Sequence, residues 1–118
     1  MRTNSLARGT MNQNLIPRSM LEQVARRFRL LGEPVRLEIL NLLHARGEMN
    51  VQELVHATGL GQANVSKHLG LLLEEGLVSR RKEGLFAFFE IDDPSLSGLC
   101  LLVCGQIRGR HDSAARTQ

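Results

Sequence analysis

Apolar residues recur at helical spacing along most of the chain, and this spacing predicts where the helices lie. In the first such stretch, Leu21, Val24 and Phe28 share one face, and Pro17 precedes them at a position that favours the first turn of a helix. Similar stripes predict four more helices, at residues 34–46, 51–58, 62–75 and 95–108. Most of these helices are short and amphipathic, so each must pack against a neighbour to be stable.

Two changes of pattern interrupt the helices. The tight turn Gly59-Leu60-Gly61 joins the third helix to the fourth, and two helices joined in this way form a helix-turn-helix. After Gly76, two β-prone runs at residues 77–81 and 85–91 flank the polar break Lys82-Glu83-Gly84, which predicts a hairpin. The predicted fold class is therefore mostly α with a small β-hairpin (α+β), a winged helix-turn-helix with an extra helix at each end.

Length and composition fit a single globular domain. The 118 residues are 42% hydrophobic and 23% charged, which is too apolar for a disordered chain. Residues 1–16 are polar and without periodicity, so we expect a flexible basic arm there, the winged-helix domain at 17–110 and a flexible tail at 111–118. No run reaches the roughly 18 apolar residues of a membrane span, and we find no export signal. We therefore expect a cytoplasmic protein without a membrane partner.

The charges are unevenly distributed along the chain. Residues 1–36 carry seven arginines against two acids, and no carboxylate occurs between Glu53 and Glu74, where Lys67 is the only formal charge. A surface that approaches a polyanion must exclude carboxylates as well as collect cations. The pattern favours double-stranded DNA as the partner, and an ordinary solvated helix face is the alternative.

The helix at residues 62–75 carries the main candidate DNA contacts. Its inward stripe is Val65, Leu69 and Leu72, so its N-terminal half exposes short amide, hydroxyl and cationic groups. Amide side chains pair with adenine, Lys reaches the acceptors of guanine, and a methyl group contacts thymine. Cations in the hairpin suit a DNA backbone or minor groove, although such residues also protect edge strands. The predicted contacts are Gln62, Ala63, Asn64, Ser66, Lys67 and His68 on the helix, and Arg80, Arg81 and Lys82 in the hairpin.

Three segments carry a resemblance to a known family. LGEPVRLEILNLL, VQELVHATGLGQANVSKHLGLLLEEGLVSRRKEG and LFAFFEIDDPS are similar to the ArsR/SmtB family of winged-helix repressors, over about residues 21–108. The resemblance implies a homodimer formed through the first and last helices, bound to an operator until an inducer releases it. It also places the recognition helix at Gln62, Asn64, Ser66, Lys67 and His68, and the wing at residues 81–85.

The last helix supports a dimer independently of the resemblance. Its apolar residues surround the helix instead of forming one stripe, so it must be buried against more than its own small domain. Two-fold symmetry would then present two recognition helices, roughly 34 Å apart, to a palindromic operator. Burial within one chain is the alternative. The predicted interface residues are Leu21, Val24, Phe28, Leu96, Leu99, Leu102, Val103 and Ile107.

Cys100 and Cys104 are the candidate sensing residues. Four residues apart on one helix, their Cβ atoms lie about 5–6 Å from each other, close enough to hold one soft ion. The thiolate motif of the resembled family, Cys-x-Cys before the turn, is absent, because that segment reads VQELVHATG. A trivalent metalloid such as As(III), another thiophilic ion or a thiol oxidant therefore fits better than zinc, nickel or cobalt. The alternative is that both cysteines only pack in the interface.

No enzymatic motif is found in the chain. It contains no Ser-His-Asp set, no His-Glu-x-x-His and no P-loop, and no strand precedes its closely spaced glycines. We expect a dimeric, sequence-specific repressor released from its operator by an inducer at the cysteine pair, with no certain cofactor. The alternatives are a winged-helix repressor without a metal inducer and a winged-helix module that binds another protein.

Overall fold

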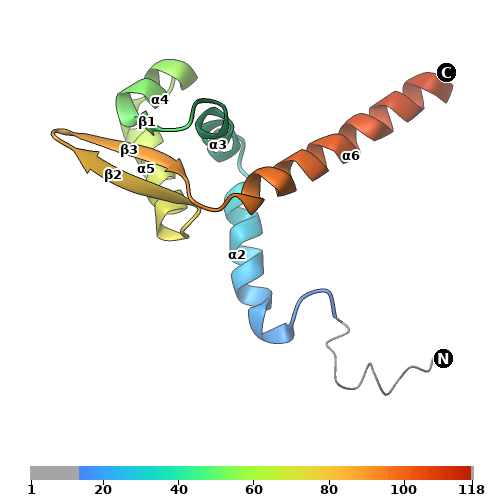
Figure 1. The fold of residues 1–118 in the computed structure, drawn as a ribbon. Helices are drawn as coiled ribbons and strands as arrows, with labels where there is room; N and C mark the ends of the chain where they lie inside the picture. The colour runs from blue at the N-terminus through green and yellow to red at the C-terminus, as the bar shows by residue number, and fades with distance from the viewer. Residues whose placement is uncertain (1–13, 118) are drawn as a thin grey trace.

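The elements follow the predicted order, with one added strand. The computed structural model describes the backbone of residues 14–117 and the side chains of residues 14–111. A 3-10 turn, η1 (Arg18–Met20), leads into α2 (Leu21–Leu31) and α3 (Pro34–Arg46). Then follow β1 (Met49–Asn50), α4 (Val51–Thr58), α5 (Gln62–Glu74), β2 (Val78–Glu83), β3 (Phe86–Ile91) and α6 (Ser95–Thr117). This arrangement confirms the predicted winged helix-turn-helix (Figure 1).

Local hydrogen bonds and a glycine determine where α4, the first helix of the helix-turn-helix, begins and ends. Asn50 and Glu53 form a reciprocal capping box at the start of α4: the Asn50 side chain accepts from the Glu53 amide at 2.8 Å, and the Glu53 carboxylate accepts from the Asn50 amide at 2.9 Å. At the other end of α4, Gly59 has a φ of +78°, which lets the chain turn sharply before α5. Helix α4 therefore begins at a residue that caps its first amides and ends at a glycine that adopts a positive φ.

The sheet has three antiparallel strands in the order β1-β3-β2. Strand β2 runs to Glu83, two residues further than expected, because Glu83 pairs with Phe86 and leaves a two-residue turn of Gly84 and Leu85. Gly84, the first turn residue, has a φ of +62°. Leu85, the second, has no positive φ, because only glycines do among the described residues. A positive φ at the first turn residue alone is the pattern of a type II′ turn. Strand β1 was missed, because two residues are too few to show a period.

A core of apolar side chains joins helices α3, α4 and α5 to the sheet. Its members are almost completely buried, and they come from both sides of the helix-turn-helix as well as from the hairpin. They are Ile39, Leu40, Leu43, Met49, Leu54, Val65, Leu69, Leu72, Leu77, Val78, Phe89 and Leu96. The core therefore fixes α5 relative to the wing, the two elements that carry the candidate contacts.

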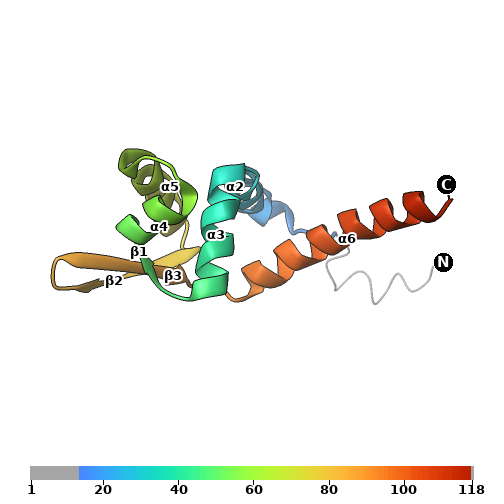
Figure 2. The same cartoon turned by 90° about the horizontal axis from the view of Figure 1, so that it is seen from above.

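Helix α6 leaves this body and extends away from it, at the opposite end of the molecule from the wing (Figure 1 and Figure 2). It runs to Thr117, whereas we expected a flexible tail from residue 111. Its two late glycines, Gly105 and Gly109, each cost about 1 kcal/mol in a helix interior, which is not enough to end it, and no proline follows Pro94. Most of the predicted arm, residues 1–13, lies outside the described residues, as does Gln118. Within residues 14–117, no helix combines the length and the apolar character that a bilayer span requires.

Candidate DNA-binding interface

The first two turns of α5 present an exposed polar face. Gln62, Ala63, Asn64, Ser66 and Lys67 are all exposed, as predicted, and no acidic residue lies in the first turn. The N-cap is Gly61, which makes no side-chain bond to the first amides of the helix. This face can therefore offer amide, hydroxyl and ammonium donors, together with backbone amides, to an anionic partner.

His68 does not belong to this face, which corrects the prediction. Its side chain is buried, and its Nδ1 lies 3.1 Å from the guanidinium of Arg36 on α3. Because a guanidinium only donates, this ring nitrogen accepts the hydrogen bond. Arg36 also donates to the carbonyl of Leu30, the residue before the end of α2. His68 therefore holds α5 against α3. The signal was present in the sequence, since His68 follows the buried Val65 by three residues and precedes the buried Leu72 by four.

The wing has two chemically different faces. Cross-strand partners share a face of a sheet. Arg80 pairs with Phe89 and Lys82 pairs with Ala87, so both cations lie on the same face as the buried Phe89. Both side chains are exposed. Arg81, opposite Phe88, lies on the other face. Only two of the three predicted wing cations therefore share a surface.

Arg81 is bound to the protein itself. It makes two hydrogen bonds with Glu48, at 2.9 and 3.0 Å, and one with Glu83 at 3.0 Å, and it lies 5.1 Å from the centre of the Phe88 ring. The hydrogen bond from Arg81 lowers the pKa of Glu48, and the bonds to both carboxylates raise the pKa of Arg81. Arg81 thus ties the wing to the segment before β1. A sequence pattern could not show this, because Glu48 is 33 residues away.

The predicted dimer residues fall into three groups. Leu102 is 74% exposed, and four others are about half exposed: Leu21, Phe28, Val103 and Ile107. Val24 and Leu99 are partly buried within the chain. Leu96 is only 5% exposed, because the first turn of α6 still lies against the core, so its assignment to the interface was wrong. The exposed members leave an apolar surface on α2 and α6, the two helices at the edge of the fold.

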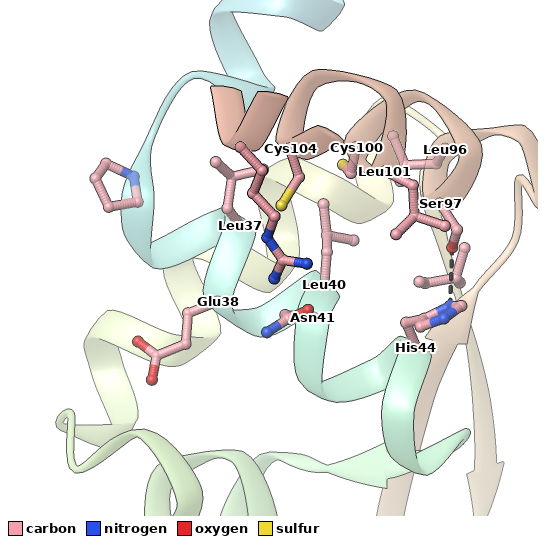
Figure 3. Close-up of a pocket in the computed structure, with 13 residues that line it drawn as sticks. Leu37, Glu38, Leu40, Asn41, His44, Leu96, Ser97, Cys100, Leu101 and Cys104 are labelled. Carbon is pink, nitrogen blue, oxygen red and sulfur yellow. Dashed lines mark hydrogen bonds between the residues drawn. The ribbon is translucent and has the colours of Figure 1, made fainter. Parts of the chain in front are cut away.

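The two cysteines line a groove of about 620 Å³ between α3 and α6 (Figure 3). Both are free thiols; Cys104 is exposed, Cys100 is partly buried, and the sulfur of Cys104 points toward α3. Leu37, Leu40 and other apolar side chains form much of its wall. The hydroxyl of Ser97 on α6 lies 3.0 Å from Nδ1 of His44 on α3, within hydrogen-bond distance. Among the residues that the structure describes, no three His, Cys, Asp or Glu side chains gather as a metal site. One chain therefore offers two thiols in a largely apolar groove.

A single arginine links both outer helices to α5. Arg27 of α2 donates to the backbone carbonyl of Glu75, just after α5, at 3.2 Å, and lies 3.5 Å from the carboxylate of Asp93, just before α6. Asp93 accepts two bonds from Ser95, which chiefly lower the pKa of its carboxyl group, and Arg27 adds a smaller electrostatic effect. Three elements therefore meet at one guanidinium.

Comparison with known proteins identifies the family. Residues 33–80 match the family described as bacterial regulatory proteins of the arsR family. A probable mercury resistance operon repressor from Streptomyces lividans is 34% identical over 102 residues, which cover 86% of this chain and 80% of that protein. The chain belongs to the arsR family.

Solved structures agree with this assignment. Mycobacterium tuberculosis Rv0081 is 31% identical with a TM-score of 0.70, over 83% of this chain and 97% of that one. The homodimeric winged helix-turn-helix DNA-binding domain Mb0332 from Mycobacterium bovis is 33% identical with a TM-score of 0.70, over 84% of this chain and 91% of that one. Membership of the arsR family confirms the expected class, a DNA-binding transcriptional regulator and not an enzyme. Duplex DNA and a second copy of the chain are the partners of this family.

Proposed function

We propose that this protein is a dimeric repressor that reads a palindromic operator with the exposed face of α5. The observation that carries the proposal is the composition of that face, where Gln62, Asn64, Ser66 and Lys67 are exposed on a segment without a carboxylate. These groups match the acceptors and donors of base edges and phosphates. Arg80 and Lys82 add two exposed cations on one face of the wing. Arg81 and His68 are left out of the proposed interface, because each is hydrogen-bonded within the protein.

The dimer in this proposal forms through the exposed apolar surface of α2 and α6. Leu102 and Val103 expose apolar area on a helix that extends away from the core, and a second copy would bury it. Two-fold symmetry sets two α5 helices roughly 34 Å apart, one turn of DNA. A repressor of this kind works on chromosomal DNA, so the proposal places the protein in the cytoplasm.

Gel-shift titrations on the DNA upstream of the coding region, at several salt concentrations, test the proposal. Wild-type protein should bind with an affinity that falls steeply with salt, because phosphate contacts release counterions. Lys67→Ala should bind about ten-fold more weakly and reduce the salt slope by about two, because a dimer loses the phosphate contact in both half-sites. Unchanged affinity in that variant removes Lys67 from the interface. If the protein shifts no DNA fragment, the result favours the alternative, a winged-helix module that binds another protein.

The two wing cations on opposite faces should behave differently. Lys82→Ala should reduce the salt slope of operator binding by about two, because it removes one phosphate contact in each half-site of the dimer. Arg81→Ala should leave that slope unchanged and speed hydrogen exchange of the β2 and β3 amides, because the wing loses its tie to Glu48. Salt titrations and exchange measured by mass spectrometry check both. Equal slopes for the two variants would contradict the two-faced wing.

We further propose that the inducer acts at Cys100 and Cys104. Both cysteines line a groove between α3 and α6. A ligand bound there would contact α3, which belongs to the core, and α6, which forms part of the proposed dimer interface. Two thiolates suit a thiophilic ion such as As(III), and thiol oxidation is the second route. The Streptomyces lividans relative is named for mercury resistance, and a Bacillus subtilis relative, 29% identical over 80 residues, is named an arsenical resistance operon repressor.

The operator complex itself reports on this sensor. Arsenite or a mild oxidant should release wild-type protein from DNA, while zinc should not. The Cys100→Ser/Cys104→Ser double variant should bind the operator normally and resist release. If every treatment leaves both complexes intact, the cysteines only pack, and the protein represses without a metal inducer.

A further inference from the structure

The groove between α3 and α6 is larger and more apolar than a bound ion requires (Figure 3). Its volume of about 620 Å³ lies in the range of pockets that hold small organic molecules, roughly 300–1,000 Å³. Leu37 and Leu40 line it from α3, and Leu101 lines it from α6. Metal sites usually draw on three or four protein ligands, and within the described residues no third candidate ligand gathers with the two thiols. The groove therefore suits an organic molecule better than a bare ion.

Helix α6 supplies a nucleophile and a hydrogen-bond donor to this groove. Cys104 carries an exposed free thiol whose sulfur points toward α3, and Arg108, four residues later, also lines the groove. Residues four apart on a helix have Cβ atoms about 5–6 Å from each other, so one small molecule can reach both. Among the described residues, no ion pair or side-chain hydrogen bond occupies the Arg108 guanidinium. A thiol and an available guanidinium therefore lie together at the edge of an apolar groove.

The groove lies on a different side of α6 from the centre of the proposed dimer surface. Leu102 is two residues from Cys100 and two from Cys104, which places it on the opposite side of the helix. Leu102 is also 74% exposed in the single chain. A dimer formed through Leu102 would therefore leave each chain with a groove of its own.

We propose that the groove binds an apolar α,β-unsaturated ketone, that Cys104 captures it covalently, and that the adduct weakens operator binding. The thiol loses its proton to water, and the thiolate sulfur forms a bond to the β-carbon of the ketone. The π electrons of the carbon–carbon double bond move toward the carbonyl oxygen, which accepts a hydrogen bond from Arg108, and water then protonates the α-carbon. The product is a thioether, and the step needs no oxidant or reductant. The effect on the operator rests on the proposed function, to which it adds an organic class of inducer.

Benzylideneacetone is the probe, and its saturated counterpart 4-phenyl-2-butanone is the control that cannot form the bond. Intact-mass spectrometry of the full-length protein should show one adduct per chain with the first compound and none with the second. Cys104→Ser should abolish the adduct, while Cys100→Ser should retain it. The rate of addition, divided by the rate of alkylation by the small polar reagent iodoacetamide, should fall about five- to ten-fold in Leu37→Asn and in Arg108→Gln. Leu37 is 40% exposed, so the fold should tolerate an amide there, and Leu37→Met should keep the wild-type ratio.

Gel shifts with the modified protein complete the test. Wild-type protein that carries the adduct should bind the operator at least about ten-fold more weakly, and Cys104→Ser treated in the same way should bind normally. Equal rate ratios for wild type and Leu37→Asn would mean that a surface thiol reacts without binding in the groove, which overturns the site. An adduct that leaves the operator complex intact overturns its role as an inducer. Unmodified protein that shifts no DNA fragment overturns the proposed operator binding instead, while the mass measurements still decide the site.

Discussion

A single carboxylate on the exposed face of α5 is expected to abolish operator binding. Ser66→Glu places an anion where the proposed interface meets DNA, and Ser66 is exposed, so the fold should tolerate the change. The variant loses a polar contact and gains repulsion from phosphate, for which we expect about 2 kcal/mol in each half-site. A dimer carries the change twice, so affinity should fall roughly 1,000-fold at about 1.4 kcal/mol per factor of ten.

Gln23→Glu is the control for net charge. It makes the same change in charge on α2, on the side of that helix opposite Leu21, Val24 and Phe28. We expect it to bind the operator within about three-fold of wild type, because screening weakens distant charges beyond roughly 10 Å. Gel shifts at matched salt compare the two variants, and circular dichroism confirms their folding. Equal losses in both would assign the effect to net charge and contradict a local contact at α5.

The second large effect should come from α6. Leu102→Glu puts a carboxylate into the proposed apolar contact, and two-fold symmetry brings a second one with it. Burying an unpaired charge costs several kcal/mol, so the dimer should dissociate at micromolar concentrations. Operator affinity should fall at least about 100-fold, because a single winged helix reaches only one half-site.

Sedimentation velocity and gel shifts measure this effect directly. The variant should sediment as a folded monomer, because Leu102 is 74% exposed in the single chain and does not support its core. Leu102→Met preserves apolar volume and should remain dimeric with nearly wild-type affinity. A dimeric Leu102→Glu protein that binds DNA would place the interface elsewhere on the chain.

Much of the fold could be predicted from hydrophobic spacing. The helices around Val65 and Leu54 show a clear period, and the glycines at 59 and 84 lie where the chain turns. The exposed face of α5 was also readable, because the absence of acidic residues is a property of a continuous segment. A sequence pattern is sufficient to predict features, such as a helix or a turn, that depend only on residues close together in the chain.

Long-range contacts account for what the pattern could not give. The position of Arg81 depends on Glu48, and that of Leu96 on a core assembled from helices earlier in the chain. Strand β1 exists because β3 pairs with Met49 and Asn50, whose own sequence shows no strand. His68 lies at the boundary between two faces, where its contact with Arg36 determines its orientation.

The bridge made by Arg27 has a mechanical consequence. One guanidinium contacts the carbonyl that follows α5 and the carboxylate that precedes α6, while its own backbone belongs to α2. The end of α5 and the residue before α6 are thus linked to α2 through the same side chain. In the proposed dimer, a ligand that tilts α6 would either break these exposed contacts of Arg27 or shift the end of α5.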